Sequence, residues 1–230
     1  MVNSQHGIQR VQSMTYRLAI VAQKGGVGKS TLARIIAVEA TKGGLSTKIG
    51  DLDTQQATCV TWAARRADAG LEPEIRAEAF GSAKTALKDA EGFDFYVFDG
   101  APHSSAETRE VCQSCDLVVI PTSESLDDLQ PSVVLANNLL KAGVPAERIA
   151  FALCITSDSV REVGGAREYL AKTPYVVLPG DIPFRSAFKT AMDRGKAITE
   201  TSFPSLRKKA DAMAQSIIDA VAVTTEQGAA

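Results

Sequence analysis

Two lysines flank a glycine-rich turn near the start of the sequence. Residues 23–31 read Gln-Lys-Gly-Gly-Val-Gly-Lys-Ser-Thr, between an apolar run at 16–22 and a helical pattern that begins at Lys29. Glycines let successive backbone N–H groups face one anion, and the positive end of a helix adds to the attraction. The order of strand, turn and helix therefore predicts a phosphate-binding loop, not a turn that merely caps a helix.

Residue types within this loop predict how a nucleotide and its metal would be held. Lys29 would reach the β- and γ-phosphates, the Ser30 hydroxyl would bind Mg²⁺, and Thr31 would lie close to the α-phosphate. The remaining positions would cradle the phosphates: Lys24, Gly25, Gly26, Val27 and Gly28. ATP and Mg²⁺ are thus the expected cofactors.

Carboxylates follow two later apolar runs. Asp51 and Asp53 come at the end of the run at 46–52, and strand alternation puts both on one side, near the phosphates. Asp99 ends the apolar run at 93–99, where a carboxylate can accept hydrogen bonds from a Mg²⁺-bound water. Gly100 can offer its backbone N–H to the γ-phosphate. For Asp53, a helix N-cap is the alternative.

Short apolar runs alternate with helical patterns along the chain. Strands are expected at 16–22, 46–52, 75–80, 93–99, 117–121, 149–156 and 175–178. Helices are expected at 29–42, 55–69, 82–90, 104–114, 127–141, 161–172 and 204–221. Runs such as 117–120 are continuously apolar, which is typical of a parallel sheet covered on both faces. The predicted fold is α/β: a doubly wound, mostly parallel sheet with helices on both faces.

Composition sets the class of protein. With 230 residues, 45% hydrophobic and 23% charged, the chain is globular, and disorder and collagen-like repetition are excluded. We expect a flexible extension at 1–15, one domain at 16–222 and a tail at 223–230. Because no run approaches the ~18 apolar residues that span a bilayer, a cytoplasmic location is expected. The four cysteines also suit a reducing compartment.

The loop resembles a specific family motif. Residues 24–30, Lys-Gly-Gly-Val-Gly-Lys-Ser, resemble the deviant Walker A motif of the ParA/MinD ATPases, since Gln23 replaces the usual first glycine and Lys24 precedes the glycine pair. The resemblance implies a P-loop fold, ATP hydrolysis and a homodimer held by ATP. It also implies that Lys24 crosses the interface to the partner's nucleotide. The alternative for Lys24 is a solvated loop residue.

Further segments between residues 16 and about 200 resemble the same family. Residues 51–56 are similar to its D-x-D-P-Q segment with Thr54 at the proline, which implies that Asp53 orients the attacking water and Asp51 supports Mg²⁺. Residues 93–102 resemble a Walker B strand. Residues 116–129 resemble the family's D-x-V segment, with Glu124 where proline is frequent.

Residues 178–185 resemble the segment that covers adenine in this family. The resemblance places Pro183 and Phe184 against the base, with Thr156 as a second candidate. For Phe188, four residues after Phe184, a place in the core is the alternative.

Two other features leave alternatives open. Cys112 and Cys115 have the spacing of a metal or redox pair, and an iron–sulfur cluster between two subunits is one interpretation. Buried thiols on a helix are the other. His103 follows Pro102 and is interpreted as a residue of a switch loop, because phosphoryl transfer needs positioning more than a base.

The net charge of −2 conceals an uneven distribution. Residues 185–209 hold seven basic and two acidic residues, a net charge of +5, while the remainder carries −7. Such a segment favours a salt-sensitive contact with DNA phosphates. A solvated helical face is the alternative. The residues predicted to bind DNA are Arg185, Lys189, Arg207, Lys208 and Lys209.

These features together predict a small ParA-like partition ATPase. Its ATP-bound dimer would bind DNA nonspecifically on the nucleoid, and a ParB-like partner would stimulate hydrolysis. A MinD-like or other cargo-positioning ATPase is the alternative. A membrane-associated regulator would need a basic amphipathic C-terminal helix, which the ending at 224–230 does not suit, so no stable membrane association is expected. A metabolic enzyme that phosphorylates or amidates a small molecule is a third class, in which Lys24 is generally absent.

Overall fold

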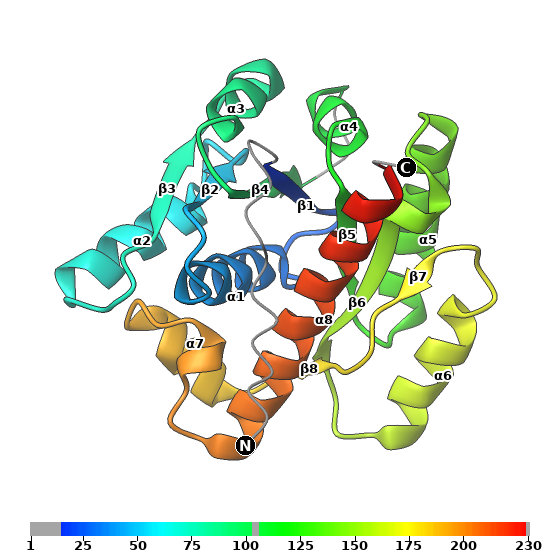
Figure 1. Cartoon of the computed structure of the whole chain (residues 1–230). Coiled ribbons are helices and arrows are strands. Elements are labelled where there is room, and N and C mark those ends of the chain that lie inside the picture. The colour runs from blue at the N-terminus through cyan, green and yellow to red at the C-terminus, as the bar shows by residue number, and fades with distance from the viewer. Residues whose placement is uncertain (1–14, 103–105, 229–230) are drawn as a thin grey trace, which may run out of the picture.

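A parallel sheet lies between two layers of helices (Figure 1). The computed structural model describes residues 15–102 and 106–228. Residues 1–14 of the predicted extension and His103 lie outside the described residues.

The sheet runs in the order β3-β2-β4-β1-β5-β6-β7, with β8 paired to β6, and every pair is parallel. Its strands are β1 (Tyr16–Ala22), β2 (Thr47–Asp51), β3 (Arg76–Ala79), β4 (Phe95–Pro102), β5 (Leu117–Thr122), β6 (Ile149–Thr156), β7 (Val176–Val177) and β8 (Ile182–Pro183). The predicted fold class is confirmed. The chain passes from β1 to β2 and β3 on one side of β1 and, after β4, to β5, β6 and β7 on the other side. Where the strand order changes direction in this way, such sheets bind ligands.

Each face of the sheet packs against its own set of helices. In the described chain these are α1 (Lys29–Lys42), α2 (Thr58–Asp68), α3 (Ala83–Ala90), α4 (Ala106–Gln113), α5 (Leu126–Lys141), α6 (Val160–Leu170), α7 (Ser186–Asp193) and α8 (Pro204–Gly228), with 3-10 turns η1 (Ala146–Arg148) and η2 (Ile198–Glu200). Helices α1, α2, α7 and α8 pack on one face and α3 to α6 on the other. Alternate side chains of β1 contribute to the two apolar layers. Leu18 and Ile20 face the first layer of helices, and Ala19 and Val21 face the second.

Some elements differ from the sequence-based expectation. Helix α2 begins at Thr58, not at 55, because residues 54–56 form a turn that Asp53 closes by accepting the N–H groups of Gln56 and Ala57. Strand β8 has two residues, too few for any periodicity to reveal. Helix α8 continues to Gly228, beyond the boundary expected at 222. Within the part of the chain described, none of the helices combines the length and the apolar character needed to cross a membrane.

A buried ion pair joins α2 to the segment that follows α7. The guanidinium of Arg66 is 1% exposed and contacts both carboxylate oxygens of Glu200, at 2.6 and 2.9 Å. It also donates to the carbonyls of Glu72, Pro73 and Gly195. A Cβ at Gly195 would come within 2.7 Å of the Arg66 backbone, so only glycine permits this approach. The pair therefore fixes the chain that leads from the α7 region back into α8.

Removing the acid of this pair should destabilise the fold. Burial opposes ionisation of Glu200, but hydrogen bonds from Arg66 outweigh it and hold the pKa of Glu200 below its usual 4.5. We expect Glu200→Gln to lower the free energy of unfolding by about 3 kcal/mol at pH 7, because Arg66 stays buried without its counter-charge. Chemical denaturation measures this, and Glu91→Gln, an exposed acid, is the control.

The same pair predicts a pH dependence. Because the folded-state pKa of Glu200 is depressed, its stabilisation is present above the unfolded value near 4.5 and disappears as pH falls through the folded value. The difference in the free energy of unfolding between wild type and Glu200→Gln should therefore become smaller at acid pH. A difference that is the same at pH 7 and pH 3 would contradict this assignment.

Candidate functional site

The glycine-rich loop lies at the carboxyl edge of the sheet, between β1 and α1. Gly26 and Gly28 have positive φ values of 76° and 108°, which side chains rarely adopt. A Cβ at Gly28 would also come 3.0 Å from the Cβ of Cys154 on β6, so the loop lies close to neighbouring strands. Gly28 caps α1 without a side-chain hydrogen bond, which leaves N–H groups of the first turn available to an anion.

The side chain of Lys29 lies over this loop among carboxylates. It is 9% exposed, and its Nζ donates to the carbonyl of Lys24 at 3.5 Å. Burial lowers the pKa of Lys29, and the charges of Asp99, Asp53 and Asp51 partly offset that effect. A phosphate placed on the loop would give this ammonium a stronger partner than a carbonyl.

Asp51 and Asp99 stand side by side on neighbouring strands but have different surroundings. The register of β2 and β4 pairs them directly. Asp51 accepts backbone N–H groups on both oxygens, from Asp53 at 3.1 Å and Cys59 at 2.9 Å. Asp51 is therefore the residue that orders the chain from 52 to 59. Its role in supporting Mg²⁺ stays a prediction.

Asp99 has the surroundings of a carboxylate that requires a cation. It is 2% exposed, and its Oδ1 has no hydrogen-bond partner within the described chain. Burial raises the pKa of Asp99 to about 6, against an opposing effect of the Ser30 hydroxyl. Such a group is costly to leave unpaired. Ser30 at the start of α1 and Asp99 on β4 are neighbouring oxygen ligands, and they therefore fit a magnesium ion with its shell of waters.

Asp53 lies at the edge of this cluster, half-buried. Its Oδ1 accepts the N–H of Gln56 at 3.1 Å, and its carbonyl accepts that of Ala57 at 2.7 Å. The N-cap of α2 is Ala57, so the N-cap alternative for Asp53 is wrong. Its position close to Lys29 leaves it available to orient a water, which remains a prediction.

Lys24, the other lysine of the loop, points away from Lys29 toward α5. Its Nζ contacts Asp128 Oδ1 at 2.9 Å and the carbonyl of Asp127. Asp128 is fixed in turn by the Ser123 hydroxyl at 2.6 Å. The two charged side chains are 45% and 23% exposed, so this ion pair is accessible. Lys24 is thus not a free solvated residue in the single chain.

The remaining predicted nucleotide residues lie around the same edge. Gly25 and Gly26 have open space around them, Val27 is buried, and Thr31 on α1 contacts Met192 of α7. Gly100 faces β1, where a Cβ would come 2.9 Å from the Ile20 carbonyl, so packing alone already requires glycine there.

The residues expected to cover adenine are brought together by β8. Pro183 pairs with Thr156 at the end of β6, and the N–H of Phe184 donates to the Thr156 carbonyl at 2.9 Å. Phe184 is 69% exposed, whereas Phe188 is 4% exposed and belongs to the core. A flat exposed ring next to the loop edge suits a base, and the core alternative holds for Phe188 alone.

The predicted DNA-binding residues differ in their pairing. Arg185 contacts Asp158, and Lys209 contacts Asp181 at 3.0 Å, so these two charges are compensated. Lys189, Arg207 and Lys208 are exposed and make no ion pair with any residue of the described chain. Glu200, an acid of the segment, is bound to Arg66 instead. DNA binding by this segment stays a prediction, and it rests mainly on Lys189, Arg207 and Lys208.

The cysteines divide into two kinds. Cys112 and Cys115 are buried in the apolar layer with α3 to α6, and burial raises the pKa of the Cys112 thiol to about 12. Their surroundings match buried thiols and not an intersubunit cluster, which needs accessible thiolates. Cys59 is different, because its Sγ lies 3.1 Å from Asp99 Oδ2. Sequence reasoning missed it, since a single cysteine carries no spacing signal.

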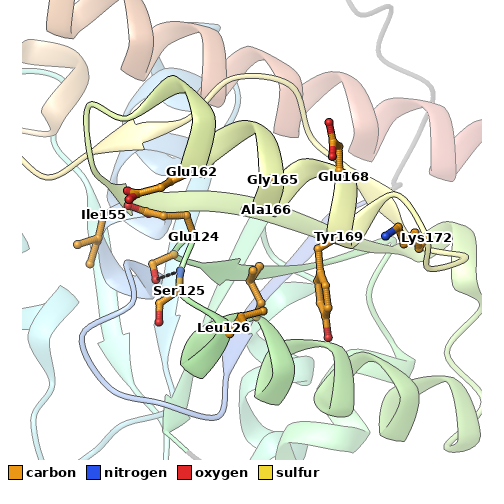
Figure 2. A pocket seen from close by; sticks show the side chains of 12 residues that line it. Glu124, Ser125, Leu126, Ile155, Glu162, Gly165, Ala166, Glu168, Tyr169 and Lys172 are labelled. Atoms are coloured by element: carbon orange, nitrogen blue, oxygen red, sulfur yellow. Dashed lines mark hydrogen bonds between the residues drawn. The ribbon is translucent and has the colours of Figure 1, made fainter.

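A pocket, which sequence reasoning also missed, lies between the start of α5 and α6 (Figure 2). This α5–α6 pocket has a volume of about 670 Å³. Figure 2 shows the carboxylates of Glu124 and Glu162 side by side at one end of it. Its lining consists of Ser123, Glu124, Ser125, Leu126, Leu129, Ile155, Glu162, Gly165, Ala166, Glu168, Tyr169 and Lys172.

Comparison with known proteins agrees with this geometry. The CobQ/CobB/MinD/ParA nucleotide-binding domain matches residues 18–198. Among solved structures, septum site-determining protein MinD of Pyrococcus horikoshii, complexed with Mg-ADP, has a TM-score of 0.72 at 18% identity and covers 92% of this chain and 99% of its own. Cyanothece McdA with ATP has a TM-score of 0.69 at 17% identity, and the match covers 90% of this chain and 97% of McdA. A putative plasmid partition protein of Borrelia burgdorferi with AMPPNP has a TM-score of 0.69 at 16% identity, and the match covers 90% of this chain and 99% of that protein. At these identities the likeness shows the fold. No curated protein matches the chain.

Replacing Asp99 should separate stability from metal binding. Because burial raises the folded-state pKa of Asp99 from 3.8 to about 6, its ionisation destabilises the fold as pH rises through that window. We expect Asp99→Asn to raise the stability of the nucleotide-free protein at pH 7.5 by about 1–3 kcal/mol and to abolish any added stabilisation by Mg²⁺.

Asp51→Asn is the matched control on the neighbouring strand. It should destabilise the protein, because an amide nitrogen cannot accept one of the two N–H groups that Asp51 binds. Thermal unfolding with and without Mg²⁺ measures both variants. Equal losses of stability in the two would contradict the assignment of Asp99 as the unpaired group.

Proposed function

The chain belongs to the CobQ/CobB/MinD/ParA nucleotide-binding family, and we propose that within it the protein is a Mg²⁺-dependent ATPase that segregates plasmid or chromosomal DNA. Its ATP-bound dimer binds DNA without sequence preference, and a ParB-like partner stimulates hydrolysis. The observation that carries the proposal is one loop with two lysines: Lys24 pairs with Asp128, and Lys29 lies near the buried Asp99, whose Oδ1 has no hydrogen-bond partner in the described chain.

Each residue of the loop edge has a task in this proposal. Lys29 turns from the Lys24 carbonyl to the β- and γ-phosphates, and N–H groups of the loop hold the phosphate oxygens. Ser30 and Asp99 hold Mg²⁺, which when bound neutralises phosphate charge. Asp53 orients the attacking water. Pro183 and Phe184 cover the adenine.

Lys24 couples the nucleotide to dimerisation. In a single chain it pairs with Asp128, and an ion pair this exposed stabilises by less than about 1 kcal/mol. Two triphosphates facing each other carry several negative charges that a lysine from the opposite subunit can neutralise. Lys24 therefore leaves Asp128 when two ATP-bound chains meet, and without ATP the intramolecular pair is preferred.

Binding of ATP and DNA tests the proposal directly. Wild type should dimerise and bind DNA with ATP and Mg²⁺, and the logarithm of its affinity should fall linearly with the logarithm of the salt concentration. Lys24→Ala should lose at least about tenfold in ATP-dependent DNA affinity, equal to about 1.4 kcal/mol. Filter binding and light scattering measure these effects.

Lys84→Ala, an exposed lysine on α3, is the control and should bind as wild type does. DNA binding that does not need ATP, or no DNA binding at low salt, would exclude the partition function. In that event a dimer that still forms with ATP would leave the cargo-positioning alternative, in which the same ATPase cycle moves another cellular body.

The α5–α6 pocket is the surface we assign to the partner. Its lining carries three carboxylates, Glu124, Glu162 and Glu168, against one lysine, Lys172, and its apolar part includes Leu126 and Tyr169. Charge complementarity therefore favours a basic amphipathic segment. Ser123 lines the pocket and also donates to Asp128, which holds Lys24. A partner seated there could thus act on Lys24 through two hydrogen-bonded side chains.

Two neighbouring glycines of α6 allow a matched test of this surface. A Cβ at either Gly164 or Gly165 would meet nothing within 4 Å, but of the two only Gly165 lines the pocket. Gly165→Arg should weaken binding of a helical Lys/Leu peptide by about tenfold or more, and Gly164→Arg should not. Fluorescence anisotropy measures this, with a Glu/Leu peptide as control. Equal affinity in both variants would place the partner elsewhere.

A further inference from the structure

Cys59 places a thiol inside the candidate magnesium site. It lies in the first turn of α2 and is fully buried. Its N–H donates to Asp51 Oδ2 at 2.9 Å, and its Sγ lies 3.1 Å from Asp99 Oδ2 and 3.9 Å from the Ser30 carbonyl. The turn at 54–56 and the pairing of Asp51 on β2 with Asp99 on β4 bring these groups together.

Three potential metal ligands meet at this point. One ligand atom each from Asp51, Cys59 and Asp99 lie within 4.8 Å of one another, and all three residues are buried. Ligand atoms at ~2.0–2.3 Å from one tetrahedral ion lie ~3.3–3.8 Å apart, so a small contraction would close the set. Asp99 Oδ1 has no hydrogen-bond partner in the described chain, which is an independent sign of a missing cation.

The chemistry of the set departs from what magnesium requires. Mg²⁺ binds oxygen and does not use sulfur, so Cys59 contributes nothing to it. Thiolate and carboxylate together suit Zn²⁺ and similar cations. Asp51 can take part although its oxygens accept N–H groups, because each carboxylate oxygen has two lone pairs. Those N–H groups hold Asp51 in position, as outer partners of metal ligands do.

We infer that this site binds a thiophilic divalent cation such as Zn²⁺, through Cys59 Sγ and the carboxylates of Asp99 and Asp51, in competition with Mg²⁺. Binding replaces the thiol proton, which passes to solvent. The other three cysteines lie apart from this cluster. With such a cation bound, Asp99 is occupied and the phosphate loop lacks its magnesium ligand.

Asp99 belongs both to this site and to the magnesium site of the proposed ATPase, but cation binding by Cys59 does not depend on hydrolysis. It is tested on nucleotide-free protein, so that failure of the ATPase proposal leaves it intact and the reverse also holds. Co²⁺ serves as the probe, because a thiolate ligand gives it a sulfur-to-metal charge-transfer band in the near ultraviolet.

Wild type should develop this band on titration with Co²⁺, and excess Zn²⁺ or a large excess of Mg²⁺ should remove it. Cys59→Ser should abolish the band and weaken Co²⁺ binding by about tenfold or more. Cys112→Ser, which removes another buried thiol, should retain both. Circular dichroism and Cys59→Ala establish that any loss is not a failure to fold.

The result has clear alternatives. A band in wild type that disappears with Cys59→Ser and persists in Cys112→Ser supports the site. No band in folded wild type, a band that persists in Cys59→Ser, or a band that disappears with Cys112→Ser would overturn it. The last outcome would favour the Cys112 and Cys115 pair instead.

Discussion

The buried carboxylate of Asp99 is the constraint on which the site depends. It stands within β4, between β1 and β2, where solvent cannot compensate its charge. Lys29, Ser30 and Cys59 surround it, and Asp51 is held beside it by the strand register. The chain supplies no full partner for this charge among the described residues. We therefore propose that a cation from outside completes the site and that the chemistry of the surrounding donors selects which one.

Two ion pairs of opposite character frame this site. Arg66 is buried, Glu200 is only 16% exposed, and two hydrogen bonds link them, so they fix the chain that leads to α8. Lys24 and Asp128 are exposed, and such a pair is weak. The buried Arg66–Glu200 pair therefore stabilises the fold, whereas the exposed Lys24–Asp128 pair is weak enough to be exchanged for another contact. The glycine-rich loop can change partners while the sheet behind it stays unchanged.

The sequence predicted the long elements well because their signals are local. Strands β1 and β6 and helix α1 begin and end as expected, since continuous apolar runs and glycine punctuation mark them. It did not predict β8, whose two residues form a strand solely by pairing with β6. It also overstated the basic segment, because Asp158 and Asp181 lie outside the window that was counted.

What the sequence by itself determined is the phosphate loop, the order of strands and helices, and the carboxylates that follow β2 and β4, because residue type and spacing along the chain are sufficient for these. The tertiary structure decided which carboxylate oxygen lacks a partner, that Lys24 pairs with Asp128, and that the Cys59 thiol lies against Asp99. These depend on burial and on contacts between residues far apart in the sequence. Burial and long-range contacts are not encoded in local spacing, since they arise only when β4, α2 and α5 are brought to the loop.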